Sequence, residues 1–426
     1  MSLAVVAVFL ALALLGMPLA FALGVASLGG LHLAGVGITI LPQRMLHAVD
    51  SFPLMAIPLF MLAGELMVKA GIVRRLVDFA DSLVGHVHGG LAHMTVISGM
   101  LFGAVSGAAV ASASALGSTL VPALRKSYPV DYSSAVVAAA ANLGPIIPPS
   151  NAMIVYALMA GASVSVGDLF MAGVLPGLIL AAGFMVLASW QARRRGYPLS
   201  GRKFSFRRLF VETRRALVIL LMPVVVVGGI VGGVFTATEG AAIAVVYALF
   251  IGFAVTRSLK LTDLPDALFR AAVTSAMVAA LIAFAATVTF VFTIDLLPQR
   301  LASFLQDLTQ DPAVFIVIVM VLLIVVGMFI ESNAAYIMLV PLLAPVALSY
   351  GIDPLVFAFL FVLNLVAGMM TPPVGVLLFV MCGVSKISMG ALVRHAWPFI
   401  VLQYAVLLLC LAAPALITWL PNALKP

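Results

Sequence analysis

Continuous apolar stretches recur along the whole chain, and each approaches the length of about 20 residues that crosses the hydrocarbon core of a bilayer as a helix. Of the 426 residues, 64% are hydrophobic and only 9% are charged, whereas a soluble domain carries roughly 25% charged residues. The apolar runs do not alternate with polar residues, which argues against a transmembrane barrel. The sequence therefore predicts an all-α integral membrane protein, a multi-span helical bundle whose first span covers residues 3–23.

The basic residues are concentrated in one part of the chain. Nine of the 22 Lys and Arg residues lie between Arg193 and Arg215, where Glu212 is the only acidic residue. A smaller basic group at residues 257–270 follows two further apolar spans. Two crossings return the chain to the same side, so we expect both groups in the cytoplasm, following the positive-inside bias. We interpret these residues as a topology signal and do not expect nucleic acid as a partner.

The chain resembles itself at a spacing of about 224 residues. A shift of 224 aligns Gly103 with Gly327, Gly144 with Gly368, and Pro148-Pro149 with Pro372-Pro373, and a shift of 223 aligns Ser165 with Ser388. Repeats of this kind are common in secondary transporters. We predict two pseudo-symmetric inverted repeats, residues 49–195 and 265–420. N-terminal spans (1–48) precede them, a basic loop and helical pair (196–264) links them, and a tail (421–426) follows.

Each predicted repeat contains a Pro-Pro step inside an apolar stretch, at about 131–160 and 353–385. Two successive prolines remove two backbone N–H donors, and the freed carbonyl groups cannot face lipid without a large free-energy cost. They need a cation or another partner, and the helix that restarts after the break has a positive dipole end that suits a carboxylate. A structural kink is the alternative for one break, but paired breaks favour a binding site.

Upstream of each break, an apolar stretch (about 98–124 and 313–348) is interrupted near its middle by small or polar residues. Such an interruption is typical of a re-entrant helical hairpin whose tip faces the broken helix. We expect Ser106 at an ion site and Glu331 as an ion ligand or proton acceptor. Close helix packing is the alternative for the small residues of the first hairpin, and we favour it for Ser114 and Ser118.

Other polar features have simpler explanations. Glu65 lies four residues before Lys69, which predicts an i,i+4 ion pair, and Glu239 follows Thr236 at the spacing of a capping box. Three histidines predict an interfacial loop in place of a metal cluster: His86, His88 and His93. Because the chain lacks the Gly-x-x-x-x-Gly-Lys, Gly-x-Ser-x-Gly and His-Glu-x-x-His patterns, we expect neither ATP hydrolysis nor another enzymatic activity.

Five segments together resemble the large membrane subunit of tripartite ATP-independent periplasmic (TRAP) transporters: "SFPLMAIPLFMLAGELM", "GAVSGAAVASASALGS", "NLGPIIPPSNAMIVYA", "FTATEGAAIAVVYALF" and "NLVAGMMTPPVGVLLFV". The resemblance implies a sodium-driven importer of organic acids in the bacterial cytoplasmic (inner) membrane, with a scaffold domain and an elevator-type transport domain. It also implies two partners, a small four-helix membrane subunit and a periplasmic substrate-binding protein. Sodium would be the coupling ion, with no cofactor and no transition metal.

The resemblance also implies where ions and substrate bind. The first sodium site would be formed by Ser106, Gly107, Asn142 and Gly144, and the second by Glu331, Asn333, Gly368 and Thr371. The substrate would lie between them, near Pro148, Ser150, Asn151, Ser332 and Pro373. Glu331 departs from the family pattern "GMFMD", in which an aspartate stands at this position.

Two other functions remain open on the sequence. A stand-alone sodium/carboxylate symporter or ion exchanger would share the layout of hairpins and broken helices, and it would work without a binding protein. An intramembrane enzyme is the second alternative, although the sequence shows no catalytic pair.

Overall fold

The computed structural model describes residues 1–197 and 204–424, and in these ranges the regular elements are helices and no strand occurs. Arg202 and Lys203 of the predicted basic loop, and residues 425–426 of the predicted tail, lie outside the described residues. Eight helical stretches of the described chain are long and apolar enough to cross a membrane: Phe52–Lys69, Val166–Arg194, Phe206–Val231, Ala237–Val255, Leu261–Ile294, Pro312–Phe329, Ser332–Ser349 and Met389–Ala412. The predicted all-α, multi-span fold is confirmed.

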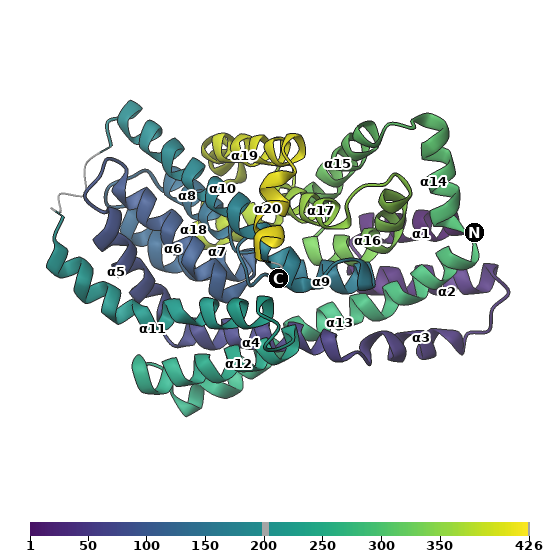
Figure 1. Cartoon of the computed structure of the whole chain (residues 1–426), viewed down its shortest axis with the longest axis horizontal. Helices are drawn as coiled ribbons and strands as arrows, with labels where there is room; N and C mark the ends of the chain where they lie inside the picture. Colours follow the sequence, from purple (N-terminus) through teal and green to yellow (C-terminus); the bar gives the residue numbers. More distant parts are fainter. Residues whose placement is uncertain (198–203, 425–426) are drawn as a thin grey trace.

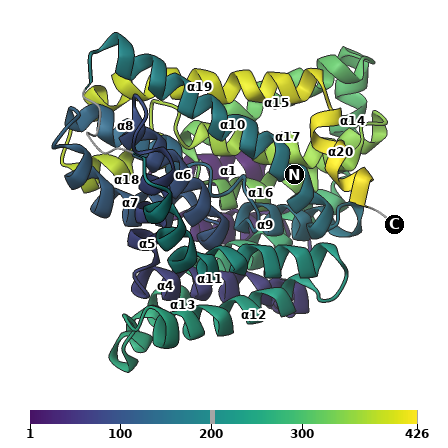
Figure 2. The ribbon, with the colours of Figure 1, turned by 60° about the vertical axis from the view of Figure 1, so that its left-hand side comes forward.

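Long helices form the lower side of the molecule in both views (Figures 1 and 2). They are α4 (Ala56–Lys69, after the turn η1, Phe52–Met55), α11 (Phe206–Val231), α12 (Ala237–Phe250, continued by the π-helical turn η3, Ile251–Val255) and α13 (Leu264–Ile294, after the turn η4, Leu261–Asp263). The N-terminal helices are α1 (Ser2–Leu14), α2 (Leu19–Leu33) and α3 (Ile40–Val49). Helix α4 packs on α12 and α13, and α13 also packs on α2 and α3.

The other helices form two series that run in the same order. The first series is α5 (Ile72–Val84), α6 (Gly90–Ser106), α7 (Ala109–Leu124), α8 (Val130–Ala141), α9 (Asn151–Ala160, followed by η2, Gly161–Ser163) and α10 (Val166–Arg194). The second is α14 (Leu297–Leu308), α15 (Pro312–Phe329), α16 (Ser332–Ser349), α17 (Pro354–Gly368), α18 (Val376–Ser385) and α19 (Met389–Ala412), followed by α20 (Ala415–Leu424). Both α10 and α19 begin after a capping serine, Ser165 and Ser388. That the two series are related by inversion stays a prediction.

The two series are interleaved in space. Helix α9 of the first series packs on α16 and α17 of the second, and α18 of the second packs on α7 and α8 of the first. Helix α19 contacts α8, and α10 contacts α17. A helix rises 1.5 Å per residue, so α8, α9, α17 and α18, with 10 to 15 residues each, are too short to cross a bilayer alone. Each therefore depends on packing against the other series.

Two predictions concern polar residues on the long lower helices. The capping box is confirmed, because Glu239 N donates to Thr236 Oγ1 at 3.3 Å and Thr236 N donates to the Glu239 carboxylate at 2.7 Å. The predicted pair of Glu65 with Lys69 is wrong, since Lys69 Nζ lies 2.6 Å from Asp266 Oδ2 on α13. Packing of α4 along α13 brings in this partner, which spacing along a single helix does not reveal.

The histidine-bearing connector and the basic segment both hold helices together. His93 Nε2 lies 2.7 Å from Ser189 Oγ, which ties α6 to α10. Arg208, at the start of α11, forms an ion pair with Asp81 of α5 at 2.5 Å. Within residues 1–197 and 204–424, no three His, Cys, Asp or Glu side chains gather closely enough to hold a metal ion.

Candidate functional site

The hairpin arms cross the broken helices at glycine pairs that the 224-residue shift relates. A Cβ atom added to Gly103 would lie 2.6 Å from Gly144 Cα, and one added to Gly368 would lie 2.7 Å from Gly327 Cα. These distances leave no room for a side chain on either glycine. Helix α6 therefore meets the end of α8, and α15 meets the end of α17, backbone against backbone.

The first hairpin tip lies on the restart of the first broken helix. The break between α8 and α9 covers residues 142–150 and includes the cis peptide bond Pro148-Pro149. The hairpin turns between α6 and α7 at Gly107, which has a left-handed φ of 62°. Asn151 N donates to Gly107 O at 3.2 Å, and a Cβ on Gly107 would lie only 2.9 Å from Pro149 O. Glycine is required here for both the backbone conformation and the close approach.

Hydroxyl and amide oxygens line the first break. Ser106 Oγ lies 2.8 Å from Ser112 Oγ, and both residues are buried. Ser112 also faces Gly144, whose added Cβ would lie 3.4 Å from Ser112 Oγ. Asn142 Nδ2 donates to Val366 O of α17 at 2.8 Å, whereas its buried Oδ1 accepts no hydrogen bond within the described chain. Such oxygens are the ligands that hard cations prefer.

The restart of α9 offers hydrogen-bond donors. Ser150 caps the helix, because its Oγ accepts from Met153 N at 3.3 Å and donates to Pro145 O at 2.5 Å. Asn151 is only 5% exposed, and its Nδ2 donates to no acceptor in the part of the chain that the structure describes. The N-terminal end of a helix carries a partial positive charge. This end, with the unpaired amide beside it, favours an anion.

The second break has a similar connection to its hairpin. It covers residues 369–375 and also contains a cis peptide bond, Pro372-Pro373. Gly375 N donates to Met328 O, near the end of α15, at 3.1 Å. This bond holds the restart of α18 against the second hairpin, as the bond from Asn151 to the tip does in the first half.

The polar side chains around the second break differ from those around the first. Thr371 Oγ1 donates to Ala367 O at 2.8 Å and lies 2.9 Å from the hydroxyl of Tyr404 on α19. Asn364 Nδ2 donates to Met320 O of α15 at 2.9 Å, and its Oδ1 is buried without a donor among the described residues. The sequence reasoning missed Tyr404 and Asn364, although Asn364 opens the segment that the self-comparison aligned.

Glu331 caps α16 in this structure. Its carboxylate accepts hydrogen bonds from Asn333 N at 2.9 Å, Ala334 N at 3.3 Å, Asn333 Nδ2 at 3.0 Å and Ser332 Oγ at 3.3 Å. All these donors belong to the first turn of α16, so the carboxylate folds back on its own helix. The role of Glu331 as an ion ligand or proton acceptor stays a prediction.

The cap leads to a stability prediction. We expect Glu331→Ala to destabilise the protein by about 1–2 kcal/mol, the usual effect of removing an N-cap. Glu331→Asp should stay close to the original chain, because aspartate is among the best N-caps. Thermal unfolding of the purified protein in detergent measures both, with Asp307→Ala on an exposed position of α14 as the control. An alanine variant as stable as the control would show that the cap is dispensable.

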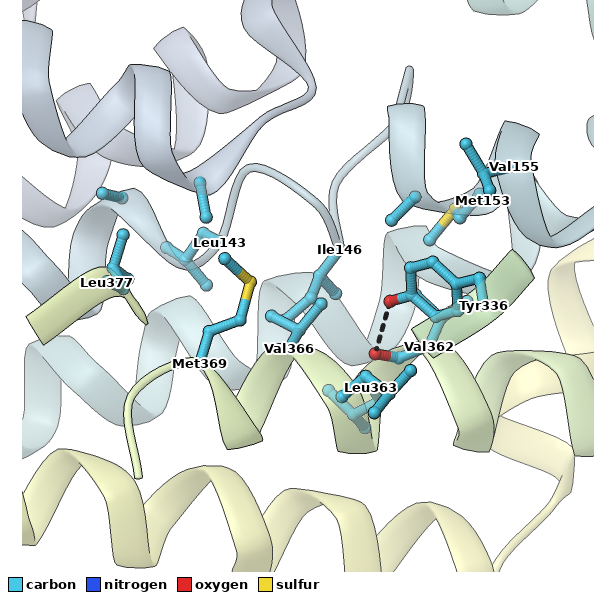
Figure 3. Close-up of a cluster of buried hydrophobic side chains, with 14 of the residues drawn as sticks. Leu143, Ile146, Met153, Val155, Tyr336, Val362, Leu363, Val366, Met369 and Leu377 are labelled. Carbon is cyan, nitrogen blue, oxygen red and sulfur yellow. Dashed lines mark hydrogen bonds between the residues drawn. The ribbon is translucent and has the colours of Figure 1, made fainter. Parts of the chain in front are cut away.

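Apolar side chains join the two breaks in the interior. Figure 3 shows Leu143 and Ile146 of the first break beside Met369 and Val366 at the second, and all four are buried. The hydrogen bond from Asn142 to Val366 O lies at the same contact. The structure therefore brings the two breaks together, although they are more than 200 residues apart in the sequence.

The remaining predicted substrate residues do not all share this interior. Pro148 and Ser332 are buried and Asn333 is partly buried, whereas Pro373 is exposed. The exposed ring of Pro373 lies outside the buried contact between the breaks. Pro148 stays within the contact of the first hairpin tip with α9.

A cavity of about 170 Å³ lies away from both breaks, between α4 and α13. Its lining is mostly apolar and consists of Leu54, Ile57, Pro58, Ser275, Ala276, Val278 and Ala279. This lining supplies a single hydroxyl group and no set of ion ligands. The two breaks, and not this cavity, therefore form the candidate site.

Comparison with known proteins places this architecture in a family. Residues 6–416 match the family described as "Tripartite ATP-independent periplasmic transporter, DctM component". The chain is 37% identical to the sialic acid TRAP transporter large permease protein SiaM of Vibrio cholerae over 416 residues, with 97% of each chain covered. It is 38% identical to the C4-dicarboxylate TRAP transporter large permease protein DctM of Rhodobacter capsulatus over 430 residues, again with 97% of each covered.

A solved structure shares the fold. The YdaH transporter of Alcanivorax borkumensis aligns with a TM-score of 0.66 at 17% sequence identity, over 92% of this chain and 90% of that chain. The full-length relatives are named as transporter permeases, so the enzyme alternative is excluded and a multi-pass location in the inner membrane follows. The resemblance inferred from the sequence is confirmed: the chain belongs to the DctM family, the large membrane component of the tripartite ATP-independent periplasmic transporters.

Proposed function

We propose that this chain is the large permease subunit of a sodium-coupled importer for a small organic acid. A periplasmic binding protein delivers the solute, and a small four-helix membrane subunit completes the complex. The relatives named for sialic acid and for C4-dicarboxylates support the substrate class, because both names describe carboxylic acids.

One observation carries the sodium coupling. Asn142 Oδ1 is buried in the first break without a donor, while its own Nδ2 is fixed on Val366 O. An unpaired polar atom in a low-dielectric interior is costly, and a sodium ion would remove that cost. The Ser106 and Ser112 hydroxyls beside the same break add two further oxygen ligands. Unwound segments of transporter helices supply sodium ligands of this kind.

The restart of α9 supports an anionic substrate. Ser150 caps the helix and Asn151 Nδ2 has no acceptor in the described chain. A substrate carboxylate at this end would accept from that amide and would meet the positive end of the helix dipole. The short helices of both series would then move with ions and substrate along the long helices α4 and α13, in the manner of an elevator.

Uptake by proteoliposomes tests the proposal, with the three components present and succinate and sialic acid as separate probes. We expect uptake only with an inward sodium gradient and only with the binding protein, and no uptake when potassium or choline replaces sodium. Sodium-independent uptake would overturn the coupling. Uptake without the binding protein would instead favour the stand-alone symporter.

The membrane potential adds a second readout. A potential of 100 mV supplies about 2.3 kcal/mol for each charge that crosses, whereas a thousandfold solute gradient requires about 4.1 kcal/mol. Two sodium ions moving with a dianion carry no net charge. With two ion sites, succinate uptake should therefore not respond to an imposed potential, and a strong response would indicate a further coupling ion.

A further inference from the structure

Tyr404 hydrogen-bonds with a residue at the second break, although it lies on a different helix. Its hydroxyl, on α19, lies 2.9 Å from Thr371 Oγ1. Thr371 is only 5% exposed and lies within the break itself. Helix α19 also packs on α17 and α18, the two halves that flank this break. Tyr404 is therefore positioned to control the side chain of Thr371 from outside the broken helix.

The direction of this hydrogen bond follows from the available hydrogens. A threonine hydroxyl has one hydrogen and two lone pairs, and Thr371 donates its hydrogen to Ala367 O at 2.8 Å. A backbone carbonyl oxygen only accepts. Tyr404 must therefore donate to Thr371 Oγ1, and this leaves one lone pair of the Thr371 oxygen free. Bonds to Ala367 and Tyr404 together fix the direction of that lone pair.

The first break has no counterpart of this pair. A shift of 224 residues places Ile147 at the position of Thr371, and shifts of 223 and 224 place Ala181 and Leu180 at that of Tyr404. None of these side chains carries a polar atom. The two breaks, similar in their glycine crossings and Pro-Pro steps, therefore differ in how a side-chain oxygen is held.

We propose that Tyr404 is a positioning residue for the second sodium site, which fixes Thr371 Oγ1 so that its free lone pair coordinates the ion. This inference rests on the proposed sodium coupling and adds to it a residue of α19. It makes the sodium affinity of the second site depend on a helix that contributes no ligand. The first site does not share this dependence.

Sodium-dependent thermal stabilisation of the purified full chain in detergent tests the proposal without knowledge of the substrate. Sodium chloride replaces choline chloride at constant ionic strength, and the midpoint of stabilisation reports sodium affinity, because an ion that binds only the folded state stabilises it. We expect Tyr404→Phe to raise this midpoint by about two- to tenfold, the factor that one hydrogen bond contributes. In choline alone, its melting temperature should change little.

The controls separate positioning from general stability. Tyr247→Phe on α12 also removes a hydroxyl, which donates to Val218 O at 2.7 Å far from the breaks, and should leave the sodium midpoint unchanged. Thr371→Val should weaken sodium binding at least as much as Tyr404→Phe. The double variant Tyr404→Phe/Thr371→Val should match Thr371→Val alone, because Tyr404 acts through that hydroxyl.

Each outcome decides between two failures. If the original chain shows sodium-specific stabilisation and Tyr404→Phe has the same midpoint, the positioning role is overturned while sodium coupling stands. If the two single variants add independently in the double variant, Tyr404 does not act through Thr371 and the inference is again overturned. If the original chain shows no difference between sodium and choline, the proposed sodium coupling fails, and the inference fails with it.

Discussion

Replacing Gly103 with alanine is expected to lower solute uptake by more than about tenfold, since each loss of about 1.4 kcal/mol is a factor of ten. The added Cβ would lie 2.6 Å from Gly144 Cα and 3.0 Å from Gly144 N. These are backbone atoms that cannot rotate away, so α6 and the first break must separate. Overpacking of this kind typically costs about 1–3 kcal/mol. The separation also displaces Asn142 and Ser112, which lie at the same crossing.

Proteoliposome uptake and thermal unfolding should be measured together for this variant. Gly228→Ala on α11 is the matched control, because a Cβ there meets no atom within 4 Å. Gly327→Ala should reproduce the defect at the second crossing, where the added Cβ would lie 3.1 Å from Gly368 Cα. Normal uptake by Gly103→Ala would mean that the hairpin and the break need not touch for transport.

Replacing Asn142 with alanine is expected to raise the sodium concentration for half-maximal uptake by more than about tenfold. The change removes the unpaired Oδ1 that we assign to the ion, and it leaves Val366 O without its donor. An unsatisfied buried carbonyl costs about 1–3 kcal/mol, so the two losses act together. Sodium titrations of uptake and of thermal stability measure the effect.

Two further variants interpret this result. Asn422→Ala, at an exposed position of α20, is the control for loss of an asparagine side chain. Asn142→Asp keeps oxygen atoms for the ion but removes the donor to Val366 O, so it should not restore normal affinity. Unchanged sodium dependence in Asn142→Ala would remove this residue from the ion site.

The self-comparison of the sequence identified pairs of residues that the structure places in contact. It aligned Gly103 with Gly327 and Gly144 with Gly368, and each hairpin glycine meets the break glycine of its own half. It was successful because a backbone crossing accepts only glycine, which leaves a mark at a fixed position. The capping box at Thr236 was equally visible, since its donors and acceptors lie within one turn.

Side-chain partners from other helices were not visible in the sequence. Lys69 pairs with Asp266 of α13 in place of Glu65, and Thr371 bonds with Tyr404 of α19. Local geometry also redirected Glu331, whose carboxylate caps α16. Spacing along one segment records which residues are near in the chain, whereas these contacts depend on which helices pack together.

The sequence by itself determined that the chain crosses a membrane many times and that two of its apolar segments are interrupted. Continuous apolar runs require helices in lipid, and a Pro-Pro step cannot continue the backbone hydrogen bonds of a helix. Only the tertiary structure decided that α9 packs on α16 and α18 on α7, which brings the two breaks together. Helices of 10 to 15 residues cannot bury their polar ends alone, and the partners that cover those ends come from the other half of the chain.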